Sequence, residues 1–270
     1  MSTILTRLRV HDTFGLLGNL HNSESLHHMF QRKMAFLRAK IISYVSPKTV
    51  LKFKCSWHGY EFYAKAMDYW RFIEEFEPRT TYFIHRIIDY DDIFIDVGAH
   101  IGFHTIHCAK KCKLVIALEP EPQNFYLLKE NIKLNNLNNV IALPIAASDN
   151  DGYAKLYISN QSTGAHTLEE KKTHYRYSTV LNVRTNRLDT LVEALNLNKI
   201  DIIKIDVEGH ETKVIKGMKR ILSINKPRVL IIEVSKLNFK FIFEYLSKYF
   251  KNVILLDKWD NERVNMAFIY

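Results

Sequence analysis

Acidic and imidazole side chains cluster directly after an apolar segment in the second half of the chain. Residues 200–207 are mostly β-branched and apolar, which predicts a buried strand. Asp206, Glu208 and His210 lie at its end. An unperturbed imidazole titrates near neutrality, so His210 is the first candidate for a general base. Carboxylates of Asp206, Glu208 and Glu233 could position a hydroxyl group or bind Mg²⁺.

Each of these side chains also has a structural interpretation. His210 precedes a predicted helix and could simply cap it, and the acids could cap helices or pair with Lys204. His166 is a second candidate base, because it lies in a polar segment, residues 159–178, of a length usually reserved for function. Histidines in such loops are more often just exposed.

A second chemical site is expected at residues 96–102, which read Asp-Val-Gly-Ala-His-Ile-Gly. The two glycines are four residues apart, which differs from the G-x-G-x-x-G spacing that seats a dinucleotide pyrophosphate. Glu119, at the end of the next predicted strand, is placed to accept both hydroxyls of a ribose. Ser148 and Asp149 end a third strand near an adenine edge. Together these features favour S-adenosylmethionine as the ligand.

Alternating strands and helices position these residues. From residue 92 onward the pattern predicts repeated β-α units, and therefore a parallel sheet with helices on both faces. Strands are expected at residues 92–97, 113–118, 140–147, 153–158, 200–207, 228–234, 253–256 and 264–270. The six-residue connector before the last strand is too short for a crossover helix, so that strand must run antiparallel. This ending is typical of the doubly wound, Rossmann-like methyltransferase sheet.

Residues 1–85 form a different region, expected to be a mainly helical N-terminal extension before a catalytic domain at residues 86–270. A helical apolar stripe lies in it, formed by Leu26, Phe30, Met34, Leu37, Ile41 and Tyr44. Basic residues beside the stripe would suit an anionic membrane surface, but packing on its own domain is the favoured interpretation. The aromatic-rich stretch at residues 57–72 could form a wall of an acceptor pocket or simply fill core.

The motifs above resemble the FkbM-type methyltransferase family, whose members depend on S-adenosylmethionine and in many cases methylate hydroxyl groups of sugars and natural products. The resemblance covers roughly residues 92–256, and its most specific part is Lys-Ile-Asp-Val-Glu-Gly at residues 204–209. Further matching segments are residues 94–102, 118–120, 146–149, 187–189 and 232–234.

The resemblance implies roles for individual residues on the cofactor side. It implies that the methionine end of the cofactor is held by Asp96, Gly98, Ala99 and Gly102. It implies that Glu119 binds the ribose, and that the adenine is held by Ala147, Ser148 and Asp149. The family commonly has Asn where this chain has His100, which can still donate one hydrogen bond to the cofactor.

The net charge of the chain is compatible with several classes of binding partner and does not select one of them. The net charge of +9 is compatible with an anionic partner, although scattered lysines usually mean a solvated surface. The acceptor is expected to be a small molecule or glycan; RNA methylation, or a binding protein that has lost catalysis, are the alternatives. The oligomeric state is left open.

The cysteines and the lengths of the apolar segments indicate whether the chain binds a metal and in which compartment it is expected. His104, Cys108 and Cys112 have helical spacing but are expected to pack as small apolar residues rather than hold a metal. Three cysteines fit a reducing compartment. Neither an eighteen-residue apolar run nor a secretory signal pattern is found, so a cytoplasmic protein is expected, with peripheral membrane contact kept open.

Overall fold

The computed structural model describes residues 8–9, 26–55, 59–72, 76–170, 177–259 and 262–270. It divides the chain into two compact units. One unit is Val10–Phe76, and the other combines Met1–Arg9 with Glu77–Tyr270. The division follows residue 76, whereas the sequence placed the boundary near residue 85.

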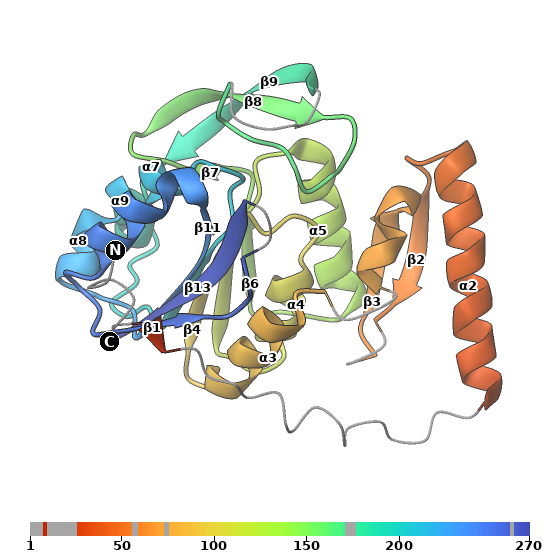
Figure 1. Ribbon diagram of the computed structural model, residues 1–270, viewed down its shortest axis with the longest axis horizontal. Helices are drawn as coiled ribbons and strands as arrows, with labels where there is room; N and C mark the ends of the chain where they lie inside the picture. Colours follow the sequence, from red (N-terminus) through yellow and green to blue (C-terminus); the bar gives the residue numbers. More distant parts are fainter. Residues whose placement is uncertain (1–7, 10–25, 56–58, 73–75, 171–176, 260–261) are drawn as a thin grey trace. The chain divides into compact units, whose positions relative to one another are not determined.

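A mostly parallel, eight-stranded sheet forms the centre of the larger unit (Figure 1). In sheet order its strands are β1 (Leu8–Arg9), β12 (Asn252–Leu255), β13 (Arg263–Ile269), β11 (Val229–Ser235), β10 (Ile202–Ile205), β4 (Ile93–Val97), β5 (Leu114–Leu118) and β6 (Val140–Leu143). Strand β13 runs antiparallel to both of its neighbours, and the other pairs are parallel. The predicted doubly wound sheet with an antiparallel last strand is therefore confirmed.

Helices cover both faces of this sheet (Figure 1). They are α3 (Pro78–Ile87), α4 (Phe103–Ala109), α5 (Pro122–Leu134), α6 (Leu188–Ala194), α7 (Glu211–Lys216), α8 (Lys219–Ser223) and α9 (Lys236–Leu246). Alternate residues of each strand point to opposite faces. Ile203 packs in the apolar cluster with α6–α9, whereas Ile202 packs in the cluster with α3–α5. Burial on both faces explains why these strands read as continuous apolar runs.

A small second sheet follows the third parallel strand and was only partly predicted. Its strands are, in sheet order, β7 (Ala146–Ala147), β9 (Tyr177–Asn186) and β8 (Gly152–Ser159). The expected strand at residues 140–147 is split, because Pro144 lacks an N–H for a central ladder and the chain then leaves for the other sheet. Strand β9 was missed because most of its side chains are polar or exposed.

The expected helix at residues 212–222 is also split, into α7 and α8. The break lies at Gly217 and Met218. A methyl group on Gly217 would lie 1.9 Å from the carbonyl oxygen of Ser148, so this point of the chain must be glycine. The close approach fixes the end of β7 against the end of α7.

The described part of the smaller unit contains one long helix, a hairpin and a short 3₁₀ helix. These are α2 (Leu26–Val45), β2 (Val50–Lys54), β3 (Glu61–Lys65) and η2 (Ala66–Phe72). Its core is aromatic: the rings of Phe53 and Phe72 stack with centroids 4.8 Å apart, and Phe62 is fully buried beside them. Part of the aromatic-rich stretch thus fills core, while Trp57 lies outside the described residues.

The apolar stripe of α2 does not pack as expected. Four of its members are exposed, namely Met34, Leu37, Ile41 and Tyr44. The expectation that the stripe packs on its own unit is wrong for these four; the side chains of Leu26 and Phe30 lie outside the described residues. Over the described part of the chain, no helix has both the length and the hydropathy that a bilayer crossing requires.

Candidate functional site

The turns after β4 and β10 touch each other at the carboxyl edge of the sheet. A methyl group on Gly98 would lie 1.8 Å from the carbonyl oxygen of Asp206, and Gly98 has a φ of +85°. The backbone N–H of Asp206 donates to the carbonyl of Val97 at 3.0 Å. Only glycine fits this approach. The two clusters that the sequence singled out are therefore adjacent, at the edge where open α/β sheets bind ligands.

Glu119 is held by the backbone of the turn after β4. Its carboxylate accepts hydrogen bonds from the N–H groups of His100 and Glu121, both at 2.8 Å, and the side chain is buried. Burial raises the pKa of Glu119 to about 8; the two N–H donors lower it, and the charges of Glu121 and Asp96 raise it. Each carboxylate oxygen keeps a second lone pair. The group can therefore accept two further hydrogen bonds, as from a vicinal diol.

His100 adopts a backbone conformation that Asn, Asp and His tolerate best among residues with a side chain. Its φ is +54°, in the left-handed region. Its ring Nε2 lies 2.9 Å from Oγ1 of Thr163, in the segment that follows β8. His100 therefore adopts the turn conformation that Asn would also tolerate. Its longer side chain reaches the segment that follows β8.

Asp96, at the end of β4, is almost fully buried and accepts a hydrogen bond from Oγ1 of Thr105 at 2.6 Å. Thr105 belongs to α4, so this contact fixes the strand end to the helix that follows the turn. Ala99 is buried within the turn, and Gly102 occupies the N-cap position of α4.

Three carboxylates converge beside this turn, at the ends of β10 and β11. Ligand oxygens of Asp206, Glu208 and Glu233 all lie within 4.8 Å of one another. Two cations pair with them: Nζ of Lys204 lies 3.0 Å from Asp206 Oδ2, and Nη1 of Arg263 donates to both Glu208 and Glu233. A divalent ion would suit the spacing, but it would compete with Arg263 for two of its three carboxylates.

Glu208 and Glu233, which both contact Arg263, have raised pKa values. Burial, then repulsion from Asp206, raises the pKa of Glu208 to about 7, and the guanidinium of Arg263 lowers it. The same burial and repulsion raise the pKa of Glu233 well above its ordinary value. For Lys204, burial disfavours the ammonium, but the charges of neighbouring acids, led by Asp206, raise its pKa overall. The cluster can therefore hold or release a proton near neutral pH.

Arg263 was missed from the sequence, although a signal for it exists. It is the first residue of β13 and lies opposite Ser235 in the antiparallel register. The start of an antiparallel strand lies at the carboxyl edge of its parallel neighbours. A charged residue at the start of a mostly apolar last strand could have been assigned to the site on this ground.

His210 connects two segments that are far apart in the sequence. Its Nε2 lies 3.0 Å from the hydroxyl of Ser148, and its Nδ1 lies 2.9 Å from Oε1 of Glu169. Although His210 occupies the N-cap position of α7, its side chain makes no capping hydrogen bond, so the capping interpretation is wrong. Burial lowers the pKa of His210, while Glu169 raises it.

The segment between β8 and β9 spans both turns of the site. Thr163 contacts His100, Oγ1 of Thr167 donates to the carbonyl of Glu208 at 2.7 Å, and Glu169 contacts His210. The predicted loop base, His166, accepts a hydrogen bond at Nδ1 from the N–H of Ser159 and so helps to shape this segment.

One of the residues assigned to the adenine contacts His210. Ala147 is buried in β7, and Ser148 follows it with its hydroxyl on His210. The hydroxyl of Ser148 also lies 3.3 Å from Asp149. Ser148 thus contacts both Asp149 and His210.

Comparison with known proteins places these residues in one family. Residues 96–260 match the family model described as the methyltransferase FkbM domain. The chain belongs to the FkbM methyltransferase family. The matched segment contains the turn after β4, Glu119, the acid cluster and His210, but ends just before Arg263.

Two of the curated relatives are methyltransferases whose names give a substrate or a methylated position. Hexuronic acid methyltransferase AglP of Haloferax volcanii is 34% identical over 146 residues, covering 53% of this chain and 56% of AglP. The 2-O-methyltransferase NoeI of Sinorhizobium fredii is 27% identical over 179 residues, covering 59% of this chain and 72% of NoeI. The match with AglP therefore spans little more than half of that protein's length.

A solved FkbM methyltransferase from Methylobacillus flagellatus KT superposes with a TM-score of 0.49 at 18% identity. The superposition covers 70% of this chain and 47% of that one.

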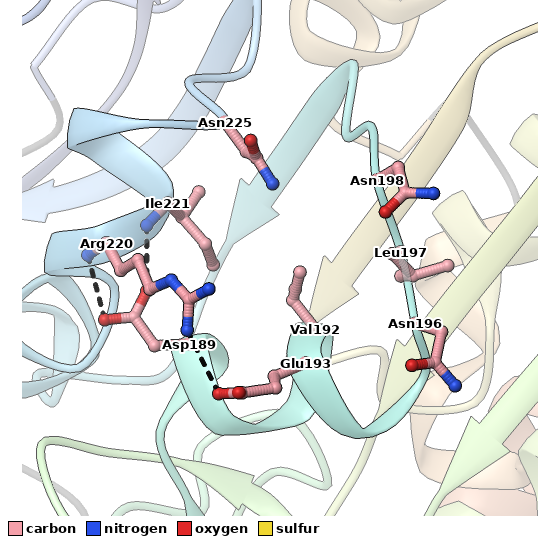
Figure 2. Close-up of a pocket in the computed structure, with 9 residues that line it drawn as sticks. All are labelled: Asp189, Val192, Glu193, Asn196, Leu197, Asn198, Arg220, Ile221 and Asn225. Carbon is pink, nitrogen blue, oxygen red and sulfur yellow. Dashed lines mark hydrogen bonds and ion pairs between the residues drawn. The ribbon is translucent and has the colours of Figure 1, made fainter.

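A surface pocket of this FkbM-family chain lies at the opposite edge of the sheet (Figure 2). It is bounded by α6, α8 and the segments that lead into β10 and β11. Figure 2 shows Asp189 accepting hydrogen bonds from the N–H groups of Arg220 and Ile221, and Arg220 pairing with Glu193. These contacts join two helices at the amino ends of the strands, away from the edge where parallel sheets bind ligands.

Proposed function

We propose that this FkbM-family protein transfers a methyl group from S-adenosylmethionine to a hydroxyl group of a sugar or glycan-like acceptor. The contact between Gly98 and Asp206 carries the proposal, because it joins the turn after β4 to the cluster of Asp206, Glu208 and Glu233. Methyl transfer needs donor and acceptor held in line within van der Waals reach. The names of AglP and NoeI, a hexuronic acid methyltransferase and a 2-O-methyltransferase, support a sugar hydroxyl as acceptor.

The donor side, as proposed, consists of the turn after β4 and Glu119. Asp96, Gly98, Ala99 and Gly102 would hold the methionine end, with His100 fixing the turn. Glu119 would accept the ribose hydroxyls, and its two fixed N–H partners support this role because they orient its free lone pairs. Ala147, Ser148 and Asp149 would line the adenine side. The bound cofactor supplies an electrophilic methyl group on sulfonium.

The acceptor side would be the acid cluster with His210. As the acceptor oxygen bonds to the methyl carbon in place of the cofactor sulfur, the proton of the acceptor hydroxyl must pass to a base. Ionised Glu169 can only accept a hydrogen bond, so the proton of neutral His210 lies on Nδ1, and Nε2 accepts from the hydroxyl of Ser148. The acceptor proton would then pass to Nε2 of His210, while Asp206 and Glu208 position the acceptor hydroxyl.

We place the reaction in the cytoplasm, because all three cysteines are buried free thiols, as in a reducing compartment. His166 is assigned to shaping the segment above the site rather than to proton transfer, because its Nδ1 accepts from Ser159.

Titration calorimetry with S-adenosylmethionine tests the donor side. We expect binding by the wild-type chain and at least a tenfold loss in Asp96→Ala, since about 1.4 kcal/mol corresponds to tenfold in affinity. Absence of binding by the wild-type chain would overturn the proposal.

Methyl transfer from labelled cofactor to a uronic acid, a neutral sugar and an RNA tests the acceptor. Label on a sugar hydroxyl supports the proposal. Label on RNA alone, with binding that falls steeply as salt rises, would replace it by the nucleic acid alternative.

A further inference from the structure

An apolar stripe on α2 is exposed within the smaller unit. Its members are Met34, Leu37, Ile41, Tyr44 and Val45, of which Tyr44 and Val45 are 79% and 83% exposed. At 100° per residue they fall within one arc about 100° wide on the helix. Ala39, on the other side of the helix, is buried at 2% exposure. The helix therefore packs on its own unit with one face and presents an apolar face outward.

Basic residues border this stripe on both sides. On the helical wheel, exposed Arg38 lies just beyond Val45, and exposed Lys40 lies just beyond Tyr44 on the opposite border. The sequence of α2 also contains Arg32 and Lys33, and it contains neither Asp nor Glu. An apolar stripe with cationic borders and no acid is complementary to a surface that is apolar below and anionic above.

We propose that α2 lies in the surface of an anionic membrane, with the stripe toward the acyl chains. Apolar side chains would enter the headgroup boundary, and Arg38 and Lys40 would reach the phosphates. Tyr44 has the amphipathic ring that favours this depth. The attachment that we propose is peripheral and uses one face of α2. The inference is independent of the methyl-transfer proposal, since it uses no residue of the carboxyl edge.

Vesicle flotation with the full chain tests the inference. We expect the protein to float with vesicles containing phosphatidylglycerol, to float weakly with pure phosphatidylcholine, and to be released as salt is raised. The double variant Leu37→Gln/Ile41→Gln is expected to lose at least about tenfold in apparent affinity, because two anchoring side chains no longer favour the bilayer. Ile224→Gln, which changes an apolar residue of 70% exposure in the larger unit, is the matched control and is expected to bind normally.

A second pair of substitutions covers the case in which the first variant does not fold. Arg38→Gln/Lys40→Gln leaves the stripe intact and is expected to weaken binding to anionic vesicles by about tenfold or more, without changing binding to neutral vesicles.

Three results would overturn the inference. They are absence of binding to anionic vesicles, equal binding by wild type and both folded variants, and a dimer in sedimentation that Leu37→Gln/Ile41→Gln dissociates while vesicle binding persists. The last result would assign the stripe to a second copy of the chain.

Discussion

The two halves of the proposed site are built in different ways. The donor side is organised by backbone: a glycine-containing turn whose N–H groups donate to the carbonyl of Leu118 and to the carboxylate of Glu119. The acceptor side consists of side chains from distant segments, in which Arg263 bridges Glu208 and Glu233. A backbone site is fixed once the strand and turn have formed, whereas a site of paired charges depends on the complete sheet.

This difference predicts how each half responds to substitution. On the donor side, one added methyl group should destabilise the fold. On the acceptor side, the loss of a charged partner should change the pKa values of the remaining groups more than it changes the unfolding free energy.

Gly98→Ala should have the largest effect. The added methyl group would lie 1.8 Å from the carbonyl oxygen of Asp206, at a φ of +85°. We expect unfolding free energy to fall by at least about 3 kcal/mol and cofactor binding to be lost. Thermal or urea unfolding measures the effect. Gly209→Ala is the matched control: its φ is +101°, but its nearest neighbouring atom is 4.0 Å away, so a loss of about 1 kcal/mol is expected. Equal losses would show that the contact between the two turns is unimportant.

His210→Ala should lower turnover about 10²- to 10⁴-fold while leaving the cofactor dissociation constant within about twofold. Glu169→Gln, which keeps the size of the side chain but no longer fixes the proton on Nδ1, should lower turnover by about tenfold. Steady-state kinetics and calorimetry separate the two quantities. An equal loss of turnover and affinity in His210→Ala would move His210 to the donor side.

Arg263→Met should shift the pH dependence of turnover. Arg263 lowers the pKa of Glu208, which is about 7, and removing it raises that pKa. Ionised Glu208 then appears only at higher pH, so the acidic limb of the profile moves upward and turnover at pH 7 falls by about tenfold, recovering in alkali. Arg263→Lys keeps a positive charge and should shift the profile less. An unshifted limb in Arg263→Met would exclude this carboxyl pair from the reaction.

Cofactor affinity should rise with pH through Glu119. Its pKa in the free protein is about 8, and hydroxyl donors favour the ionised form, so binding lowers that pKa and releases a proton. Affinity is then expected to increase by up to about tenfold per pH unit below about pH 8 and to level off above it. Calorimetry across this range measures the slope, and Glu119→Gln should abolish it. A flat profile in the wild type would separate Glu119 from the cofactor.

The turn that we propose for the donor side could be located from the sequence because its requirements are local. Gly98 and Glu119 follow strands whose continuous apolar runs reveal them, and a turn of this kind needs its glycines wherever it occurs. The mostly parallel sheet and the antiparallel β13 also followed from chain pattern and connector length.

The acceptor side was predicted only in part, because its partners come from other segments. Nothing in the sequence near Glu208 indicates Arg263, which lies 55 residues away, and nothing near His210 indicates Glu169. Strand β9 was missed for a related reason, since its exposed, polar face carries little periodic signal.

Photocrosslinking of labelled S-adenosylmethionine, followed by peptide mapping, tests the central claim most directly. The account predicts label on peptides containing residues 96–121 or 146–149, with loss of labelling in Asp96→Ala. Label on residues 189–198 or 220–225, which line the pocket in Figure 2, would contradict it, as would the absence of any specific label.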